Sequence, residues 1–236
     1  QPENNPLTNM MQSEHERRAY LRAMGIDLWI PRDQLDVEPE CAEPEVQPAA
    51  GEYDWDELRS AVAGCTRCPL HASRTQTVFG VGSPAADWMI IGEAPGAEED
   101  RRGEPFVGRA GKLLDEMLLA IREKRESVFI ANILKCRPPN NRDPSPDEAA
   151  SCRPYLERQI ELVRPKIILA VGRIAAQQLL QSDAPVGRLR GKVHRLGDTP
   201  LVVTYHPAYL LRSPSQKRKS WDDLCLAAGV MAGAAA

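Results

Sequence analysis

From residue 88 onward, short apolar runs alternate with stretches that have the periodicity of amphipathic helices, and this alternation limits the fold more than any other feature. Four runs have the length and composition of buried strands: residues 88–92, 128–132, 166–171 and 200–204. Helices are predicted at 111–121, 148–163, 173–180 and through Trp221 and Leu224. Strands joined through helices run parallel, and parallel sheets are covered on both faces. The pattern therefore predicts an α/β fold built on a mostly parallel, four-stranded sheet.

The composition is that of an ordinary globular protein. Of the 236 residues, 42% are hydrophobic and 27% are charged, which is enough for a sizeable core. No apolar run approaches the roughly 20 residues that cross a bilayer, and the first residues do not resemble a signal peptide. We therefore expect no membrane partner and a cytoplasmic location, where structural disulfides are rare.

Four cysteines have the pattern of metal ligands. Cys65 and Cys68 form a CxxC pair, and Cys136 and Cys152 follow, each beside Arg and Pro. A CxxC turn directs two sulfurs to one side of a loop, so four thiolates at this spacing can converge on one centre. A metal centre is favoured over disulfides in a reducing compartment. The residues alone leave zinc and an iron–sulfur cluster as alternatives and favour zinc.

Charge and proline divide the chain. Residues 1–50 are predicted to be an N-terminal extension, with a short helix near 14–30 and a disordered, acidic, Pro-rich linker after it. Residues 51–236 are predicted to form the main domain. Residues 188–219 are almost purely basic although the net charge is −3. Such a segment either binds a polyanion or forms a solvated surface, and charge alone does not separate the two.

Ligands of parallel α/β sheets bind beyond the carboxyl ends of the strands. Three loops at such ends carry unusual residues: 92–106, 132–144 and 206–212. Phe106 is either a core plug or a stacking surface for a ring. Asn132 is either a turn-former or a double hydrogen-bonding partner for an amide-like edge. His206 is either structural or catalytic.

Taken together, these loops and the cysteines resemble one known family. The chain is similar to family 4 uracil-DNA glycosylases, the iron–sulfur branch of the uracil-DNA glycosylase superfamily. The matching motifs stand in family order at residues 65–70, 92–96, 105–108, 132–139, 141–142 and 206–212. The resemblance implies a three-layer α/β/α fold, uracil-containing DNA as partner, and a 4Fe–4S cluster on Cys65, Cys68, Cys136 and Cys152.

The resemblance also implies a role for each base-facing residue. Phe106 would stack on a flipped-out uracil, and Asn132 would read its Watson–Crick edge. His206 would donate a hydrogen bond to uracil O2 as negative charge develops there. Glu93 would stabilise the sugar cation or position water, because Ala94 stands where other branches of the superfamily keep an Asp.

Further residues complete the implied site. Gly92 and Ala94 would lie in the substrate loop, and Glu99 would hold that loop through Asn141. Leu210 would be the wedge that fills the space left by the flipped base. Phosphates would be bound by Arg212, Arg190 and Lys192.

The N-terminal extension has a resemblance of its own. Residues 17–29 are similar to the N-terminal peptide of the bacterial DNA polymerase III psi subunit, with an Arg pair, a Leu and then Gly-Ile-x-x-Trp. The resemblance implies docking on a clamp loader or another replisome component through residues 17–30. The alternative is a helix that folds back on the main domain. A second function follows: a replisome-associated binding protein with a glycosylase-like body of reduced or no catalysis.

Overall fold

The structure, a computed structural model, describes residues 20–21, 23–25 and 53–233. The chain divides into two units, Gln1–Gln47 and Pro48–Ala236. In the first unit Tyr20, Leu21 and Ala23 are helical. The rest of the predicted helix near 14–30 and the predicted linker lie outside the described residues, so these predictions, and the domain boundary at residue 50, stay predictions. The second unit is described below.

The second unit is built on a six-stranded sheet with the order β1-β3-β2-β4-β6-β5. The strands are β1 (Val81–Gly82), β2 (Trp88–Gly92), β3 (Phe129–Asn132), β4 (Ile167–Val171), β5 (Val193–Leu196) and β6 (Thr199–Thr204). The four predicted strands are the central ones, and they pair in parallel. The predicted α/β fold with a mostly parallel sheet is therefore confirmed.

The predicted number of four strands is wrong, because β1 and β5 add antiparallel edges. Neither edge strand contains an apolar run from which a strand could be predicted. β1 has only two residues, and β5 reads Val-His-Arg-Leu with alternately exposed and half-buried side chains. Short and charged edge strands are a common means of preventing further strand pairing.

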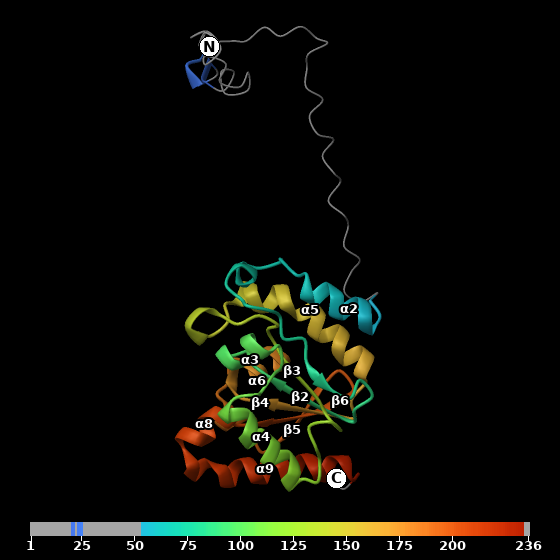
Figure 1. Cartoon of the computed structure of the whole chain (residues 1–236). Helices are drawn as coiled ribbons and strands as arrows, with labels where there is room; N and C mark the ends of the chain where they lie inside the picture. The colour runs from blue at the N-terminus through green and yellow to red at the C-terminus, as the bar shows by residue number, and fades with distance from the viewer. Residues whose placement is uncertain (1–19, 22, 26–52, 234–236) are drawn as a thin grey trace, which may run out of the picture. The chain divides into compact units, whose positions relative to one another are not determined.

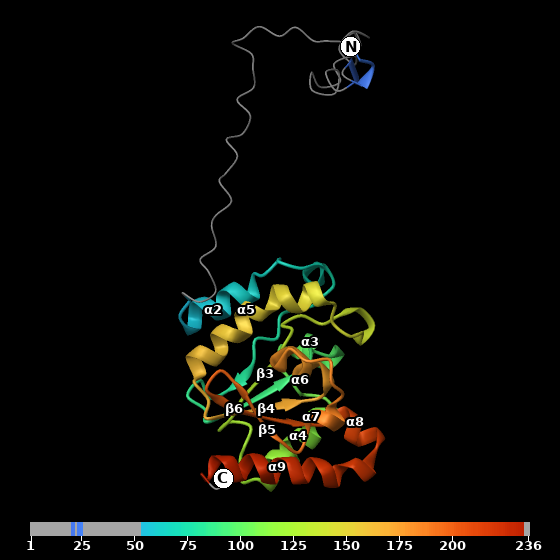
Figure 2. The same cartoon turned by 180° about the vertical axis from the view of Figure 1, so that it is seen from behind.

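Helices cover both faces of the sheet, which gives the three-layer α/β/α arrangement that the resemblance implies (Figures 1 and 2). One face packs against α2 (Trp55–Ala63), α5 (Pro146–Val163) and α6 (Arg173–Leu180). The other packs against α4 (Arg109–Ala120), α8 (Pro207–Arg212) and α9 (Lys217–Met231). The shorter helices are η4 (Pro69–Ala72), α3 (Ala97–Arg102), η5 (Pro139–Asn141), α7 (Val186–Leu189) and η6 (Pro214–Gln216).

Alternate side chains of each central strand enter opposite cores. On β2, Met89 and Ile91 pack against the first group of helices, whereas Trp88 and Ile90 pack against the second. This period of two, with every position buried, explains why the strands read as continuous apolar runs.

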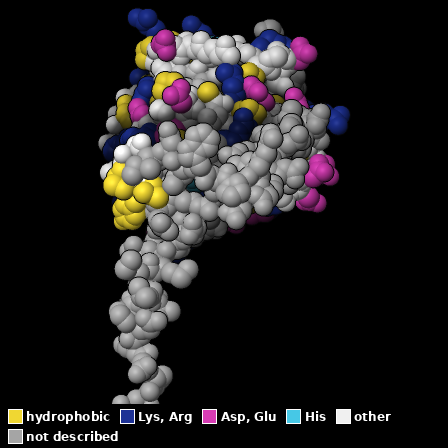
Figure 3. Space-filling model, turned by 90° about the horizontal axis from the view of Figure 1, so that it is seen from above, with side chains coloured by type: hydrophobic (Ala, Val, Ile, Leu, Met, Phe, Trp, Pro, Cys, Tyr) yellow, Lys and Arg dark blue, Asp and Glu magenta, His cyan; other side chains and the backbone are white. Residues whose placement is uncertain are grey.

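Figure 3 looks onto the side of the molecule that carries α2 and α5. On the part drawn in colour, basic and acidic side chains are intermingled.

None of the described helices has the length and apolar character that a membrane crossing requires.

Candidate active site

A cavity of about 660 Å³ opens at the carboxyl ends of the central strands. Each of the four parallel strands contributes at its end: Glu93 after β2, Asn132 at the end of β3, Gly172 after β4 and His206 after β6. This is the place where open α/β sheets bind ligands. The cavity is lined by Glu93, Ala94, Gly96, Glu99, Phe106, Ala110, Asn132, Asn141, Gly172, Arg173, Val186, Tyr205, His206, Ala208, Tyr209 and Arg212.

Asn132 presents an unused hydrogen-bond acceptor. Its side chain is buried, and its Oδ1 has no partner among the described residues. Gly92 provides the room for it: a Cβ at Gly92 would lie 2.4 Å from Asn132 Oδ1 and 2.6 Å from Phe106 Cζ. Buried polar atoms are nearly always bonded, so an unpaired acceptor in a cavity points to a ligand that donates a proton.

His206 is held as a neutral hydrogen-bond donor. It caps α8, and its Nδ1 accepts from the Ala208 N–H at 3.1 Å. Burial, with a further contribution from Arg212, lowers the pKa of His206 to about 4. A neutral imidazole whose Nδ1 accepts carries its proton on Nε2. His206 therefore has one N–H to offer, and its ring stacks with Phe106 at 5.6 Å between centroids.

Glu99 fixes the loop that carries Phe106. Its Oε1 accepts from the N–H groups of Val107 at 3.1 Å and Gly108 at 3.3 Å. The predicted hold through Asn141 is replaced by these amide bonds, since Asn141 accepts from Arg137 instead. Both Glu99 and Asn141 still line the cavity.

Glu93 lies where its proton affinity is raised. Burial raises the pKa of its carboxyl, Asp143 adds to the rise, and Arg173 opposes it. Arg173 forms an ion pair with Asp143 and lines the cavity. Arg173 is not among the residues predicted from the sequence, although its position directly after a predicted strand and glycine is a usable signal.

The four cysteines gather on the face of the sheet that α2 and α5 cover, and all four belong to or pack against one core cluster. Cys136 and Cys152 are buried, and Cys65 and Cys68 are half-buried. Burial raises the pKa of Cys152 to about 11. Within residues 20–21, 23–25 and 53–233, no set of three or more potential ligands meets the geometry of a single metal ion.

Hydrogen-bond donors are aimed at two of these sulfurs. The guanidinium of Arg74 donates to Cys136 Sγ at 3.2 Å, and the backbone N–H of Lys135 donates to Cys152 Sγ at 3.2 Å. Such donors stabilise thiolate ligands and are a usual part of iron–sulfur sites.

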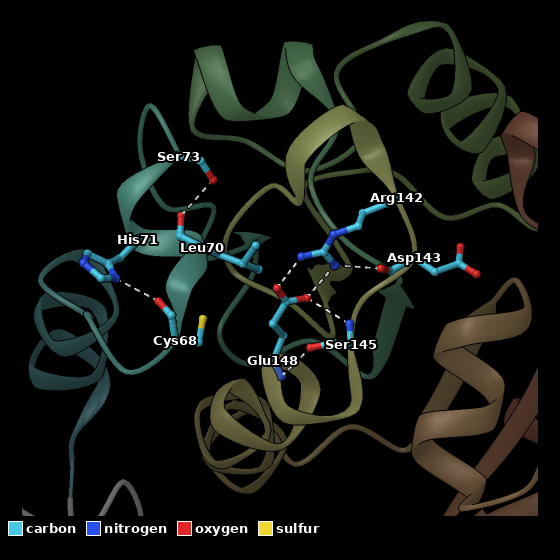
Figure 4. Close-up of polar contacts among 8 residues, drawn as sticks. All are labelled: Cys68, Leu70, His71, Ser73, Arg142, Asp143, Ser145 and Glu148. Atoms are coloured by element: carbon cyan, nitrogen blue, oxygen red, sulfur yellow. Dashed lines mark hydrogen bonds and ion pairs between the residues drawn. The ribbon is translucent and has the colours of Figure 1, made fainter.

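An ion pair braces the loop between Cys136 and α5. Arg142 donates to both carboxylate oxygens of Glu148, at 2.8 and 2.6 Å. Glu148 also forms a capping box with Ser145 at the start of α5. Figure 4 shows this network on one side and the η4 turn after Cys68 on the other. The helix that supplies Cys152 is thereby fixed at its first turn.

Buried Lys135 connects the thiols to the base of the cavity. Its Nζ donates to the Asn132 carbonyl at 2.9 Å and to Gln159 Oε1 at 2.6 Å. Gln159 in turn donates to the Phe79 carbonyl. One chain of hydrogen bonds thus joins the end of β3 to the C-terminal half of α5.

Known proteins with similar sequences belong to the family whose motifs supply these cavity residues and cysteines. A family profile described as the uracil DNA glycosylase superfamily matches residues 79–226. The chain belongs to the uracil-DNA glycosylase superfamily. A type-4 uracil-DNA glycosylase of Archaeoglobus fulgidus is 43% identical over 176 residues, which cover 71% of this chain and 88% of the relative. That of Thermotoga maritima is 44% identical over 171 residues, covering 70% and 89%. A type-5 enzyme of Pyrobaculum aerophilum is 28% identical over 189 residues, covering 66% and 83%.

Within this family fold, two expected DNA contacts are revised. Leu210 is 1% exposed and belongs to the core beside α4 and α9, so it cannot serve as a wedge without leaving that core. The next residue, Leu211, is 37% exposed. Arg190 is bound to the buried carboxylate of Asp223 at 2.9 Å. This ion pair holds the Arg190 guanidinium against Asp223, with 16% of the Arg190 side chain exposed.

The remaining expected residues are placed as follows. Arg212 lines the cavity, whereas Lys192 is exposed and does not line it. Tyr205 and Tyr209 line it as well, with ring centroids 5.1 Å apart. Neither tyrosine is predicted from the sequence, although Tyr209 belongs to the loop 206–212 and Tyr205 directly precedes it.

Proposed function

We propose that this protein excises uracil from DNA by hydrolysing the N-glycosidic bond. The observation that carries the proposal is the unpaired Asn132 Oδ1, buried beside Phe106 and the donor His206 in one cavity. The type-4 relatives support it, since their names state the same activity.

Recognition of uracil follows from the polarity of its edge. Asn132 Oδ1 accepts from uracil N3–H, and its amide N–H donates to O4. Cytosine presents the reverse pattern and would leave two buried groups unpaired. Phe106 stacks on the ring, and we expect thymine to be rejected by a steric conflict with its 5-methyl group. The nucleotide must leave the base stack to enter this site.

Bond cleavage uses His206 and Glu93. As the C1′–N1 bond breaks, its electron pair goes to the uracil ring and negative charge develops at O2, where His206 Nε2–H donates. A donor already placed at developing charge typically accelerates a reaction about 10²- to 10³-fold. The sugar becomes an oxocarbenium-like cation. Glu93, which lines the cavity, accepts a proton from the water that adds at C1′. That proton then passes to the uracil anion or to solvent, so that the products are uracil and an abasic sugar and Glu93 is again a carboxylate.

The contact with DNA involves the rim of the cavity. Arg212 and Arg173 bind phosphates beside the flipped nucleotide, and Leu211 fills the space that the base leaves. Lys192 adds a more distant phosphate contact. Binding through phosphates weakens steeply as the salt concentration increases. If the affinity for DNA does not change between about 50 and 200 mM salt, the proposal that these residues bind phosphates is wrong.

For the cysteines we propose a structural 4Fe–4S cluster. The donor set fits: four thiols on one core cluster, with an Arg74 N–H and a backbone N–H directed at their sulfurs. Four thiolates also suit zinc. Iron and sulfide analysis of purified protein, with its absorbance near 400 nm, separates the two metals.

The replisome contact remains a separate proposal, supported only by the resemblance of residues 17–30. Binding to a clamp loader in a pull-down, and its loss on Trp29→Ala, would support it. A cytoplasmic location is likewise a prediction.

The decisive experiment is a uracil-excision assay on a labelled oligonucleotide. The wild type should produce an abasic site, and His206→Ala should reduce the rate about 10²- to 10³-fold. His194→Ala is the matched control, because His194 binds the Leu189 carbonyl away from the cavity and should leave the rate within twofold. Failure of the wild type to release uracil from any uracil-containing DNA would refute the function and favour the binding protein.

A further inference from the structure

The backbone of Phe106 has a conformation that bulky residues rarely adopt. Its φ is +54°, in the left-handed region. Such a conformation persists only where the surroundings enforce it, and it occurs preferentially at functional sites. Phe106 lines the cavity and stacks with His206, so the enforced conformation determines where its ring stands.

Two groups enforce this conformation from opposite sides. Glu99 binds the N–H groups that follow Phe106, as described above. On the other side, Arg125 donates to the Phe106 carbonyl at 3.2 Å and also to the Pro105 carbonyl. Arg125 lies in the turn between α4 and β3, nineteen residues along the chain from Phe106.

Arg125 is itself fixed. It forms an ion pair with Asp115 of α4 at 3.3 Å, and only 19% of its side chain is exposed. Gly111 of the same helix lets the loop with Phe106 lie close to α4, since a Cβ at Gly111 would lie 1.7 Å from the Phe106 carbonyl oxygen. The carbonyls of Pro105 and Phe106 are therefore held against α4 by the planar, forked guanidinium.

We infer that Arg125 is a positioning residue, which acts through Phe106 on the binding of the flipped base. The inference rests on the proposed function and adds a residue that touches neither the cavity nor the substrate. Lysine keeps the charge but supplies no rigid fork, so it cannot hold two adjacent carbonyls in the same geometry. The Phe106 ring is then free to leave its place over the base.

The test is a double-mutant cycle read through free uracil, a product that fills the base site alone. Arg125→Lys should raise the inhibition constant of uracil and KM for uracil-DNA about 5- to 20-fold, with kcat changed less than threefold. In a Phe106→Ala background the same substitution should change both values less than twofold, because the residue through which it acts is gone.

Two further variants keep the outcome decisive. Arg153→Lys, at an exposed ion pair with Glu157, should change neither value. Asp115→Asn leaves Arg125 present but less constrained; it should raise the uracil inhibition constant two- to fivefold, and it replaces Arg125→Lys if that variant does not fold. Equal effects with and without Phe106 would overturn the inference while leaving uracil excision intact. Absence of excision by the wild type would instead refute the proposed function.

Discussion

His206 works as a neutral donor because its surroundings remove the charged form. The pKa of about 4 lies below the ordinary value of 6.5, so the fold favours the neutral imidazole. We predict that His206 adds no limb to the excision rate between pH 5 and 8, because its own protonation lowers the rate only near pH 4. A fall of the rate at mildly acidic pH that persists in His206→Gln belongs to Glu93, whose pKa burial raises. A limb near pH 6.5 that disappears in His206→Gln would contradict this.

The same shift has a consequence for stability. A histidine whose folded pKa is depressed contributes stability that is present above about pH 6.5 and is lost as pH falls toward 4. His206→Gln should therefore flatten the decrease of the melting temperature over this range. His71→Gln, at an exposed site, is the control.

Leu210 and Leu211 are adjacent, yet the structure gives them opposite roles. Leu210→Ala removes a core side chain and should lower the free energy of unfolding by about 2–5 kcal/mol. Leu211→Ala should leave stability within about 0.5 kcal/mol, because the side chain is partly exposed. Leu211→Ala should instead slow excision from duplex DNA about tenfold or more, with a smaller effect on single strands, where there is less stacking to replace.

Thermal melting and excision assays on both variants check the pair. If Leu210→Ala were stable but excised uracil from duplex DNA poorly, Leu210 rather than Leu211 would be the residue that fills the space left by the base.

The start of α5 depends on a charged contact that acid should remove. Arg142 lowers the pKa of Glu148 to about 2. The ion pair therefore stabilises the folded protein fully above about pH 4.5, and this stabilisation is lost as pH falls toward 2. Glu148→Gln should lower the free energy of unfolding by about 2 kcal/mol at pH 7. The difference from the wild type should shrink below pH 4.5 in melting curves recorded across pH.

Glu157→Gln provides the comparison within the same helix. Its partner Arg153 is an exposed neighbour four residues away, so the change should be within about 0.5 kcal/mol. A wild-type advantage over Glu148→Gln that is constant from pH 7 to pH 3 would show that shape, rather than charge, holds the turn.

The central elements could be predicted from the sequence because their signals are local. β2 and α6 have the predicted bounds, since a buried strand must be apolar throughout and α6 follows directly after a strand-end glycine. β1 and β5 were not predicted, because a strand of two residues, or one of four whose side chains are alternately exposed and half-buried, carries no such pattern.

The site shows the same division between local and distant causes. The residues at strand ends, Asn132 and His206, were predictable from position. Arg125, which meets Phe106 through the packing of a distant turn, was not. Burial of Leu210 rather than Leu211 also depends on how α8 lies against α4, and a motif does not encode that orientation.

The cysteines join segments that are far apart in the chain, and this suggests what the cluster stabilises. Cys65 and Cys68 precede the sheet, Cys136 follows β3 and Cys152 stands in α5. A centre on all four would close long loops and attach α2 to α5, so its loss should release the segment before β1. The cavity lies at the strand ends and contains none of the four cysteines.

We therefore predict that Cys68→Ser abolishes the absorbance near 400 nm and lowers the melting temperature by about 10 °C or more. Excision at low temperature should survive, within about tenfold of the wild type, because Asn132, Phe106 and His206 are held by β3, Glu99 and α8. Cys225→Ser, at an exposed thiol outside the set, should change neither absorbance nor melting. A Cys68→Ser protein that melts like the wild type but releases no uracil would give the cluster a direct part in catalysis.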